Sequence, residues 1–348
     1  MQKVYVGLSG GVDSATSAAL LQAQGYDVTG VFIKIWRPEF IECTWREDRL
    51  DAMRVCAALS IPFREIDLSH EYKEQVIDTM IADYQRGITP NPDVLCNEKI
   101  KFGSFMQWAL AAGADMIATG HYAQIKIQDG IPRLVRGVDT SKDQSYFLYR
   151  LSKDELAKAM FPIGSMKKAD VREKARRFGL PVSEKPDSQG LCFVGDVSMR
   201  DFLKRFITVE AGSVIDTTGK VIGTHEGAAL YTMGQRHGFT VTHDESPLPY
   251  FITMIDTNAN ILTVSTDRHD AARKKVQIGN VHWIDKSPNL PLRLQVQTRY
   301  HEPPIVAEIT EERGRIICTF NEPHIASPGQ SLVIYDDDTC LGGGIIQK

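Results

Sequence analysis

Hydrophobic and polar positions divide the chain into two halves with different spacing. In the first half, short apolar runs typical of buried strands cover residues 4–6, 28–35, 63–67 and 116–119. Stretches with helical spacing lie between and after them, at 15–24, 47–59, 71–86, 99–112, 146–151 and 162–177. This alternation predicts an α/β fold, in which a doubly wound parallel sheet has helices on both faces. A ligand of such a sheet is expected beyond the carboxyl ends of its strands.

After about residue 206 the pattern changes to the alternation of antiparallel strands. Hairpins are predicted at 212–222 and 251–264, and strands at 292–297 and 315–320. The second half therefore consists of two mainly β modules, of which the last is expected to be a small β-barrel. We predict a catalytic domain at 1–205, a small central β-rich domain at 206–273 and a C-terminal β-barrel domain at 274–348.

The composition is that of an ordinary globular protein. Of the 348 residues, 43% are hydrophobic and 24% are charged, and the formal net charge is −4. This slightly acidic balance excludes a protein coated with positive charge. No run approaches the roughly 18 apolar residues of a membrane span, and the first strand leaves no room for a targeting peptide. We therefore expect a cytoplasmic protein without a membrane partner.

A dense run of basic side chains lies in the helical segment expected at about 150–205. Its members are Lys167, Lys168, Arg172, Lys174, Arg176 and Arg177, and Lys185, Arg200, Lys204 and Arg205 follow them. A charge run of this kind is usually just a solvated helix face. Together, however, these residues would give an acidic chain a local surface for the phosphates of a nucleic acid.

A glycine-rich turn with two hydroxyl residues and a carboxylate follows the first strand and precedes the first helix. Its sequence is Ser9-Gly10-Gly11-Val12-Asp13-Ser14. Glycine lets the backbone approach a ligand closely, and the N–H groups of the helix that follows favour an anion. The spacing matches neither the Walker loop nor the dinucleotide loop. The turn predicts a nucleotide phosphate site in the doubly wound domain, the alternative being an ordinary turn between strand and helix.

Six cysteines, at 43, 56, 96, 192, 318 and 340, form no Cys-x-x-Cys pair and no zinc pattern. Cys96 follows two prolines in the stiff segment 89–97, near the start of a helix predicted from Lys99. The helix dipole, Lys99 and Lys101 would lower the pKa of its thiol, and Asp93 would serve as acid or base. The alternative is a small buried cysteine that fills space. Cys192 lies in a loop rich in Gly, Ser and Asp.

The glycine-rich turn resembles the pyrophosphate loop of the ATP pyrophosphatases, and nearly the whole chain resembles the tRNA-specific 2-thiouridylases. The elements that carry the second resemblance are Ser9 to Ser14, Asn91-Pro92-Asp93-x-x-Cys96-Asn97, Gly120-His121-Tyr122-Ala123, Lys142-Asp143-Gln144-Ser145, Cys192-Phe193, Tyr231-Thr232-x-Gly234-Gln235-Arg236 and Ser327-Pro328-Gly329-Gln330. They appear in the order found in that family. The Asn-Pro-Asp-x-x-Cys-Asn element separates it from other pyrophosphate-loop enzymes.

The resemblance implies a sulfurtransferase that adenylates the C2 oxygen of the wobble uridine in tRNA and replaces it with persulfide sulfur. The products would be 2-thiouridine, AMP and pyrophosphate. Cys192 would carry the persulfide, Cys96 would be the nucleophile and Asp93 the acid or base, and the two cysteines would end as a disulfide. ATP and Mg²⁺ are the implied cofactors, with Asp13 near the metal.

The resemblance also assigns binding residues. The ATP-binding residues implied are Gly7, Leu8, Ser9, Gly10, Gly11, Val12, Asp13, Ser14, Ile33 and Gly120. The tRNA-binding residues implied are Asn91, Pro92, Asp93, His121, Lys142, Asp143, Gln144, Arg299, Tyr300 and Gln330. The family often has Met where this chain has Ile33, which keeps an apolar surface for adenine. The implied partners are tRNAs for Lys, Glu and Gln, and a sulfur-relay protein or cysteine desulfurase.

Two other functions stay open. Another ATP pyrophosphatase, such as an amide- or lysidine-forming ligase, would leave Cys96 and Cys192 inert. A non-catalytic tRNA-binding protein on a decayed scaffold would have no use for the intact loop from Ser9 to Ser14.

Overall fold

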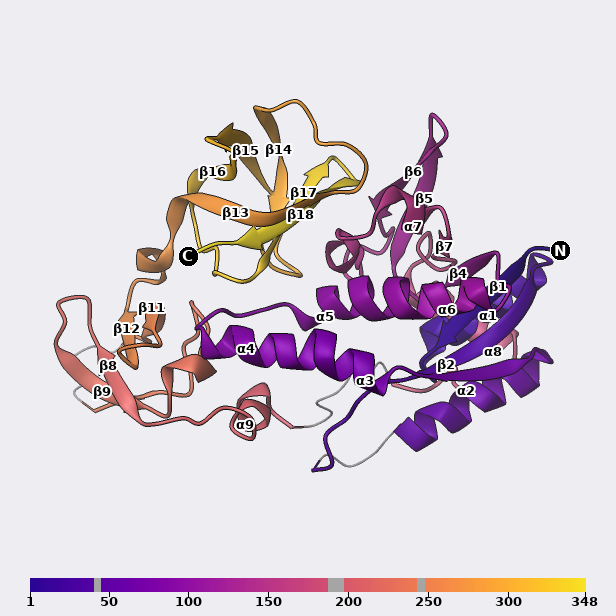
Figure 1. Cartoon of the computed structure of the whole chain (residues 1–348), viewed down its shortest axis with the longest axis horizontal. Helices are drawn as coiled ribbons and strands as arrows, with labels where there is room; N and C mark the ends of the chain where they lie inside the picture. Colours follow the sequence, from indigo (N-terminus) through magenta and orange to yellow (C-terminus); the bar gives the residue numbers. More distant parts are fainter. Residues whose placement is uncertain (41–44, 187–196, 243–247) are drawn as a thin grey trace.

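A parallel-sheet domain is followed along the chain by two β domains (Figure 1). The computed structural model describes residues 1–40, 45–186, 197–242 and 248–348. Within these ranges, none of the helices is both long enough and apolar enough to cross a membrane.

The first domain contains five parallel strands in the order β3-β2-β1-β4-β7. The strands are β1 Lys3–Leu8, β2 Asp27–Lys34, β3 Phe63–Asp67, β4 Met116–Ala118 and β7 Ala159–Met160. The helical segments of this part of the chain are α1 Val12–Ala23, α2 Trp45–Leu59, α3 Ser69–Tyr72, η1 Lys73–Asp78, α4 Thr79–Gln85, α5 Pro92–Leu95, η2 Cys96–Phe105, α6 Met106–Ala111, η3 Ser145–Leu148, α7 Lys153–Leu156, α8 Lys168–Arg177 and α9 Met199–Leu203.

Side chains of β1 alternate between the two faces of the sheet. Val4 and Val6 belong to one buried cluster with Ala15 of α1 and Val55 of α2. Tyr5 belongs to a second cluster, which contains Phe105 at the end of η2. Because helices cover both faces, the doubly wound parallel sheet predicted from the sequence is confirmed.

A hairpin that the hydrophobic pattern did not predict leaves this domain and joins the C-terminal one. It consists of β5 Ala123–Gln128 and β6 Ile131–Arg136, and β6 pairs with β18 through Leu134 and Cys340. Its turn contains Asp129 and Gly130, both with positive φ. Asp-Gly between alternating residues is a strong hairpin signal, so the sequence did contain the information.

Strand pairing in the two β domains is antiparallel, as expected of the second half, except between β8 and β12, which pair in parallel. The central sheet has the order β10-β9-β8-β12-β11, with β8 Gly212–Ile215, β9 Val221–His225, β10 Thr240–Val241, β11 Phe251–Asp256 and β12 Ile261–Ser265, and with η4 Ala228–Leu230 and η5 Arg268–Ala271 nearby in the chain. The last six strands are β13 Arg273–Trp283, β14 Leu292–Gln297, β15 Ile305–Glu312, β16 Arg315–His324, β17 Ser331–Asp336 and β18 Thr339–Ile346. They close into a barrel because β13 pairs with both β16 and β18. Both predicted hairpins and the barrel are therefore confirmed.

The helix predicted to start near Lys99 begins earlier, at Pro92. Asn91 caps it, with its side-chain oxygen accepting from the Val94 N–H at 3.4 Å. Proline fits the first helical position because the N–H that it lacks would have no helical partner there. Cys96 consequently follows the first turn, at the start of the π-helical segment η2, and does not precede the helix. Likewise, the short helix expected at 146–151 is the 3-10 turn η3.

The start of this helix lies where the three domains meet. The side-chain amide of Gln330, in the barrel domain, donates to the carbonyl oxygens of Thr89 at 2.8 Å and Pro90 at 3.2 Å. The Thr89 hydroxyl contacts the hydroxyl of Thr232 in the central domain at 3.1 Å. Figure 1 shows α3–α4 and α5–α6 running side by side from the sheet toward the two β domains. The β domains therefore fix the segment that precedes Asp93 and Cys96.

An ion pair joins the same helix to the barrel one turn further on. Arg150 donates from Nε to Glu98 Oε2 at 2.5 Å, and its Nη1 donates to the carbonyl of Asn280 on β13 at 3.1 Å. Burial opposes ionisation of Glu98, but hydrogen bonds from Arg150 and Lys99 outweigh it and hold the pKa of Glu98 below its usual range.

Replacing Glu98 by Gln should therefore lower the free energy of unfolding by about 1–3 kcal/mol at neutral pH. Because the pKa is depressed in the folded state, this contribution is present above the unfolded pKa of about 4.3 and is lost as pH falls through the folded value. Urea unfolding at pH 7 and pH 4 measures it. Arg177→Ala, which removes an exposed pair with Glu173, is the control and should change stability by less than about 0.5 kcal/mol. Equal effects of the two substitutions would contradict the prediction.

Candidate active site

The glycine-rich turn lies at the carboxyl end of β1, between the ends of its neighbours β2 and β4. Gly10 has φ +76°, and a Cβ there would lie 2.5 Å from the Asp48 carbonyl oxygen, so only glycine fits. The Ser14 hydroxyl contacts the Ser9 hydroxyl at 3.3 Å and donates to the Gly11 carbonyl at 3.2 Å. The turn is therefore an ordered loop, with backbone N–H groups and hydroxyls at the start of α1. This arrangement suits an anion.

Two further predicted nucleotide residues lie against this loop. A Cβ on Gly120 would lie 2.6 Å from the Ser14 nitrogen, so the backbone after β4 approaches the first turn of α1 as closely as a glycine allows. On the other side, the Ile33 side chain lies beside Gly7, where an added Cβ would be 3.6 Å from Ile33 Cδ1. The structure thus brings Gly7, Leu8, Val12, Ile33 and Gly120 together around the turn.

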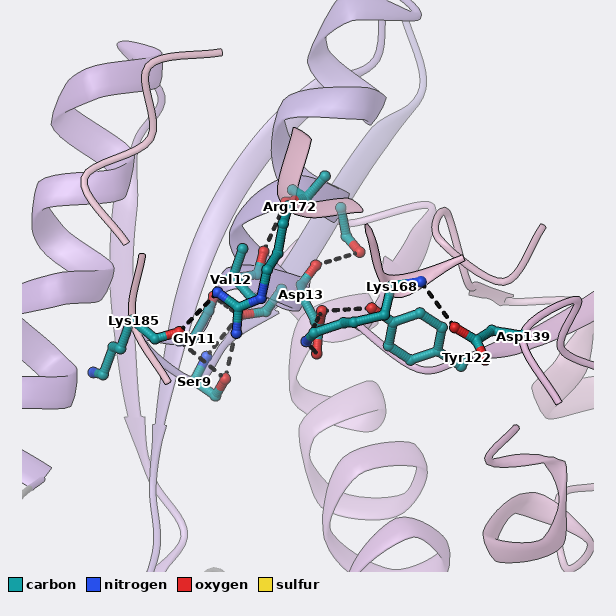
Figure 2. A network of polar contacts seen from close by, with 12 residues as sticks. Ser9, Gly11, Val12, Asp13, Tyr122, Asp139, Lys168, Arg172 and Lys185 are labelled. Atoms are coloured by element: carbon teal, nitrogen blue, oxygen red, sulfur yellow. Dashed lines mark hydrogen bonds and ion pairs between the residues drawn. The ribbon is translucent and has the colours of Figure 1, made fainter. Parts of the chain in front are cut away.

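Asp13, the predicted magnesium ligand, holds a lysine. Lys168 Nζ lies 2.8 Å from both carboxylate oxygens, and the Tyr122 hydroxyl donates to Oδ1 at 2.8 Å (Figure 2). In the described ranges, three or more His, Cys, Asp or Glu residues nowhere cluster as a metal site. Mg²⁺ usually binds one or two carboxylates together with substrate phosphates. The single carboxylate of Asp13 fits a Mg²⁺ ion that is held jointly by the protein and by substrate phosphates.

The second group of predicted residues surrounds the start of the helix that begins at Pro92. Cys96 is a thiol without a disulfide and is only 6% exposed. Asp93, three residues earlier, is half-buried, and this burial raises the pKa of its carboxyl despite the opposing charge of Lys101. A carboxyl with a raised pKa can exchange protons closer to neutral pH. Asp93 and Cys96 share one turn of helix, so an acid–base group accompanies the thiol.

His121 links the two groups, because it follows Gly120 directly. Its Nδ1 lies 2.7 Å from the Thr119 hydroxyl, and its Nε2 lies 3.4 Å from Lys101 Nζ on η2. Burial, and then the charge of Lys101, lower the pKa of His121 well below its usual value, so the imidazole is neutral at pH 7. The glycine-rich turn and the helix that carries Cys96 are thus connected through the dipeptide Gly120-His121.

Several predicted tRNA residues use their polar groups inside the protein. Asp143 is 9% exposed and accepts from the backbone N–H groups of Gly137 at 2.8 Å and Ser145 at 3.1 Å. The side-chain oxygen of Gln144 accepts from the Tyr122 N–H at 3.0 Å. Lys142 is half-buried. The Lys142–Gln144 segment therefore supports Tyr122 and, through it, Asp13.

Arg299, Tyr300 and Gln330 bring the barrel domain to the site. Arg299 donates to the Met233 carbonyl at 3.1 Å and to the Ser327 hydroxyl at 2.8 Å, so it ties the two β domains together. The Tyr300 ring packs on Phe147, with ring centroids 4.4 Å apart. Burial, followed by the negative charges of Asp143, Asp93 and Asp139, raises the pKa of Tyr300 to about 12. Tyr300 therefore stays a neutral hydroxyl near the helix that carries Asp93.

Two outcomes could not be foreseen from motif spacing. Lys168 and Tyr122 contact Asp13, although the sequence associated Lys168 with a nucleic acid surface and gave Tyr122 no role. Their only sequence signals were the basic run and the Gly-His-Tyr-Ala element. Cys192, the predicted persulfide carrier, lies outside the described residues, so its relation to Cys96 stays a prediction.

Replacing Asp93 by Asn should stabilise the fold at pH 8. Since the pKa of Asp93 is raised by burial, the unfolded chain releases this proton first, from about pH 3.9 upward, and the wild type loses stability as pH rises toward the folded pKa. Asn imitates the protonated form and avoids that loss. Urea unfolding at pH 8 and pH 5 measures the effect, with exposed Asp129→Asn as the control. A variant less stable than wild type at pH 8 would refute it.

Family models match the three parts of the chain. They are described as tRNA methyl transferase HUP domain at residues 2–196, tRNA methyl transferase PRC-barrel domain at 200–266 and aminomethyltransferase beta-barrel domain at 273–346. Solved structures overlap weakly: a U34-tRNA thiolase from Methanococcus maripaludis has 19% identity over 55% of this chain and 60% of its own, with a TM-score of 0.36. Overlap this weak carries no information on function.

Curated relatives match the whole length. The tRNA-specific 2-thiouridylase of Methylobacillus flagellatus is 41% identical over 99% of this chain and 98% of its own. The corresponding proteins of Francisella philomiragia and of Escherichia coli O6:K15:H31 are each 42% identical, over 99% and 100% of this chain and 99% and 97% of their own. Identity at this level over entire chains shows common descent, and the chain belongs to the tRNA-specific 2-thiouridylase family.

Proposed function

We propose that this protein is a tRNA-uridine 2-sulfurtransferase, which converts the wobble uridine to 2-thiouridine at the expense of ATP. The observation that carries the proposal is the pairing of two sites. An anion-binding loop at Ser9–Ser14 adjoins a helix with a thiol and a carboxyl, Cys96 and Asp93, and Gly120-His121 connects them. One site suits phosphate chemistry and the other suits sulfur chemistry.

The residues around the loop fit ATP. Gly10 and Gly120 allow the turn to pack closely against Asp48 and the first turn of α1. Ser9 and Ser14 offer hydroxyls for phosphates, and Ile33 offers an apolar surface for adenine. Mg²⁺ would be held by Asp13 together with phosphate oxygens, and it would supply charge neutralisation there. Binding it requires Lys168 to give up at least part of its contact with Asp13.

The thiol helix fits the sulfur step. Once the C2 oxygen of uridine carries AMP, the terminal sulfur of the Cys192 persulfide attacks C2 and AMP leaves with that oxygen. The Cys96 thiolate then attacks the Sγ of Cys192, which breaks the S–S bond to the transferred sulfur and leaves 2-thiouridine. A Cys96–Cys192 disulfide forms, and a cellular thiol reduces it. Asp93 exchanges the proton of the Cys96 thiol or the uridine.

The finer assignments belong to the same proposal. The tRNA-binding residues are Asn91 to Asp93, His121, Lys142 to Gln144, Arg299, Tyr300 and Gln330. Of these, His121, Asp143, Arg299 and Gln330 act mainly by holding others in place, since their polar groups bond within the protein. The domains span 1–205, 206–273 and 274–348, with a basic tRNA-binding segment at about 150–205. Substrates are the tRNAs for Lys, Glu and Gln, a sulfur-relay protein or cysteine desulfurase supplies the persulfide, and the reaction takes place in the cytoplasm.

Incubation of the full chain with ATP, Mg²⁺, a persulfide source and unmodified tRNA tests the proposal, with nucleoside mass analysis as the measurement. We expect 2-thiouridine from wild type, and a drop of at least about a hundredfold in Cys96→Ser and Cys192→Ser, because each removes a group that bonds to the moving sulfur. Cys56→Ser is the matched control, since Cys56 is buried in the cluster between α1 and α2.

Two results would redirect the proposal. AMP and pyrophosphate without sulfur in the RNA would indicate a ligase that forms an amide or lysidine. Binding of tRNA with no ATP consumption would indicate a non-catalytic binding protein.

A further inference from the structure

The basic helix α8 presents two of its cations to the nucleotide loop. Lys168 and Arg172 are four residues apart, so they lie on one helix face. Val171 and Ala175 share this face, and they are buried beside Leu20 and the core residues of α1. Packing against α1 therefore directs Lys168 and Arg172 toward the start of α1, where the loop lies (Figure 2).

Three other basic residues of this segment are paired elsewhere. Arg176 pairs with Glu184 at 2.7 Å, and Arg177 pairs with Glu173. Lys185 lies 3.0 Å from Asp48 and 2.7 Å from Asp51. Carboxylates therefore neutralise these three cations, whereas Lys168 and Arg172 lie beside the loop in Figure 2.

The protein holds Lys168 in place at two points. Its backbone N–H donates to Asp139 Oδ2 at 2.9 Å, so a carboxylate from the segment after β6 caps α8. Its ammonium contacts both oxygens of Asp13 at 2.8 Å and lies 5.7 Å from the centre of the Tyr122 ring. The Arg172 guanidinium is oriented by the carbonyls of Ser183 and Lys185, each at 3.0 Å from Nη1. Both cations are thus positioned and only partly exposed.

Electrostatics explains why two cations are needed beside this loop. The amino end of α1 contributes roughly half a positive charge, which the carboxylate of Asp13 more than cancels. Without a nearby cation, Asp13 would repel a polyphosphate from the loop. Lys168 removes that repulsion, and Arg172 adds a charge suited to phosphate oxygens.

We propose that Lys168 and Arg172 bind the β- and γ-phosphates of ATP and then the pyrophosphate that leaves, and that the Lys168–Asp13 ion pair is the resting state of this site. When a magnesium polyphosphate binds, Asp13 would hold the metal and Lys168 would move from Asp13 to phosphate oxygens. This inference rests on the proposed use of ATP, and it assigns the basic residues of α8 that face the loop to the nucleotide and not to tRNA.

Calorimetric titration of the full chain with pyrophosphate, ATP and AMP tests the proposal. Lys168→Met and Arg172→Met should each weaken binding of pyrophosphate and ATP by about 10- to 100-fold. AMP lacks the β- and γ-phosphates, so its affinity should change less than about twofold. Arg177→Ala, on the outer face of the same helix, should leave all three affinities unchanged.

A second variant should change the affinity for pyrophosphate in the opposite direction. Asp13→Asn removes the negative charge that competes for Lys168, so pyrophosphate without Mg²⁺ should bind more tightly than it does to wild type. The gain that wild type shows on adding Mg²⁺ should be lost. Melting temperatures of all variants, measured without ligand, establish that each is folded.

Three results would overturn the proposal: equal weakening of AMP and pyrophosphate in Lys168→Met, unchanged pyrophosphate affinity in that variant, or no binding of pyrophosphate or ATP by wild type. If the binding pattern holds but no sulfur enters tRNA, the proposed thiolation fails while the assignment of Lys168 and Arg172 stands.

Discussion

The contact between Gln330 and the backbone of Thr89 and Pro90 is the constraint on which the thiol site depends. These residues directly precede the helix that carries Asp93 and Cys96, and the loop opposite is packed so closely that a Cβ on Gly329 would lie 2.8 Å from the Thr89 carbonyl oxygen. Lys348, the last residue, also donates to the Arg86 carbonyl at 2.6 Å. The C-terminal barrel thus holds the start of the helix that carries Asp93 and Cys96, although Gln330 lies more than two hundred residues away in the chain.

This contact explains why the sequence predicted the fold better than the site. Strands and the nucleotide loop follow from local patterns, such as the alternation in β1 and the glycines before α1. The π-helical segment η2 has no comparable local signal, because its residues would suit an ordinary helix, and neither does the interface at Thr89. Pro92 illustrates the difference: the two prolines predicted a loop, whereas Asn91 caps a helix that starts at the second of them.

The same difference applies to charge. A basic run in a sequence cannot say which cations face solvent, but the helical spacing within it can. Val171 and Ala175 mark the buried face of α8, and Lys168 and Arg172 share that face, while Arg176 and Arg177 lie outside it and are exposed. The helical spacing therefore divides the basic side chains into two groups, one that faces the protein and one that is paired at the surface.

The dipeptide Gly120-His121 keeps the glycine-rich turn and the helix that carries Cys96 in fixed relative positions. Gly120 has no room for a side chain against α1, and His121 is fixed by Thr119 and Lys101, so the backbone between the sites cannot shift independently of either. A uridine whose C2 oxygen carries AMP must present C2 to sulfur before water reaches it. The glycine-rich turn and the helix that carries Cys96 both pack against this dipeptide. In the proposed reaction, the intermediate would therefore need no transfer between separate sites. Holding both reacting groups in one site makes their reaction effectively unimolecular, which lowers its entropic cost.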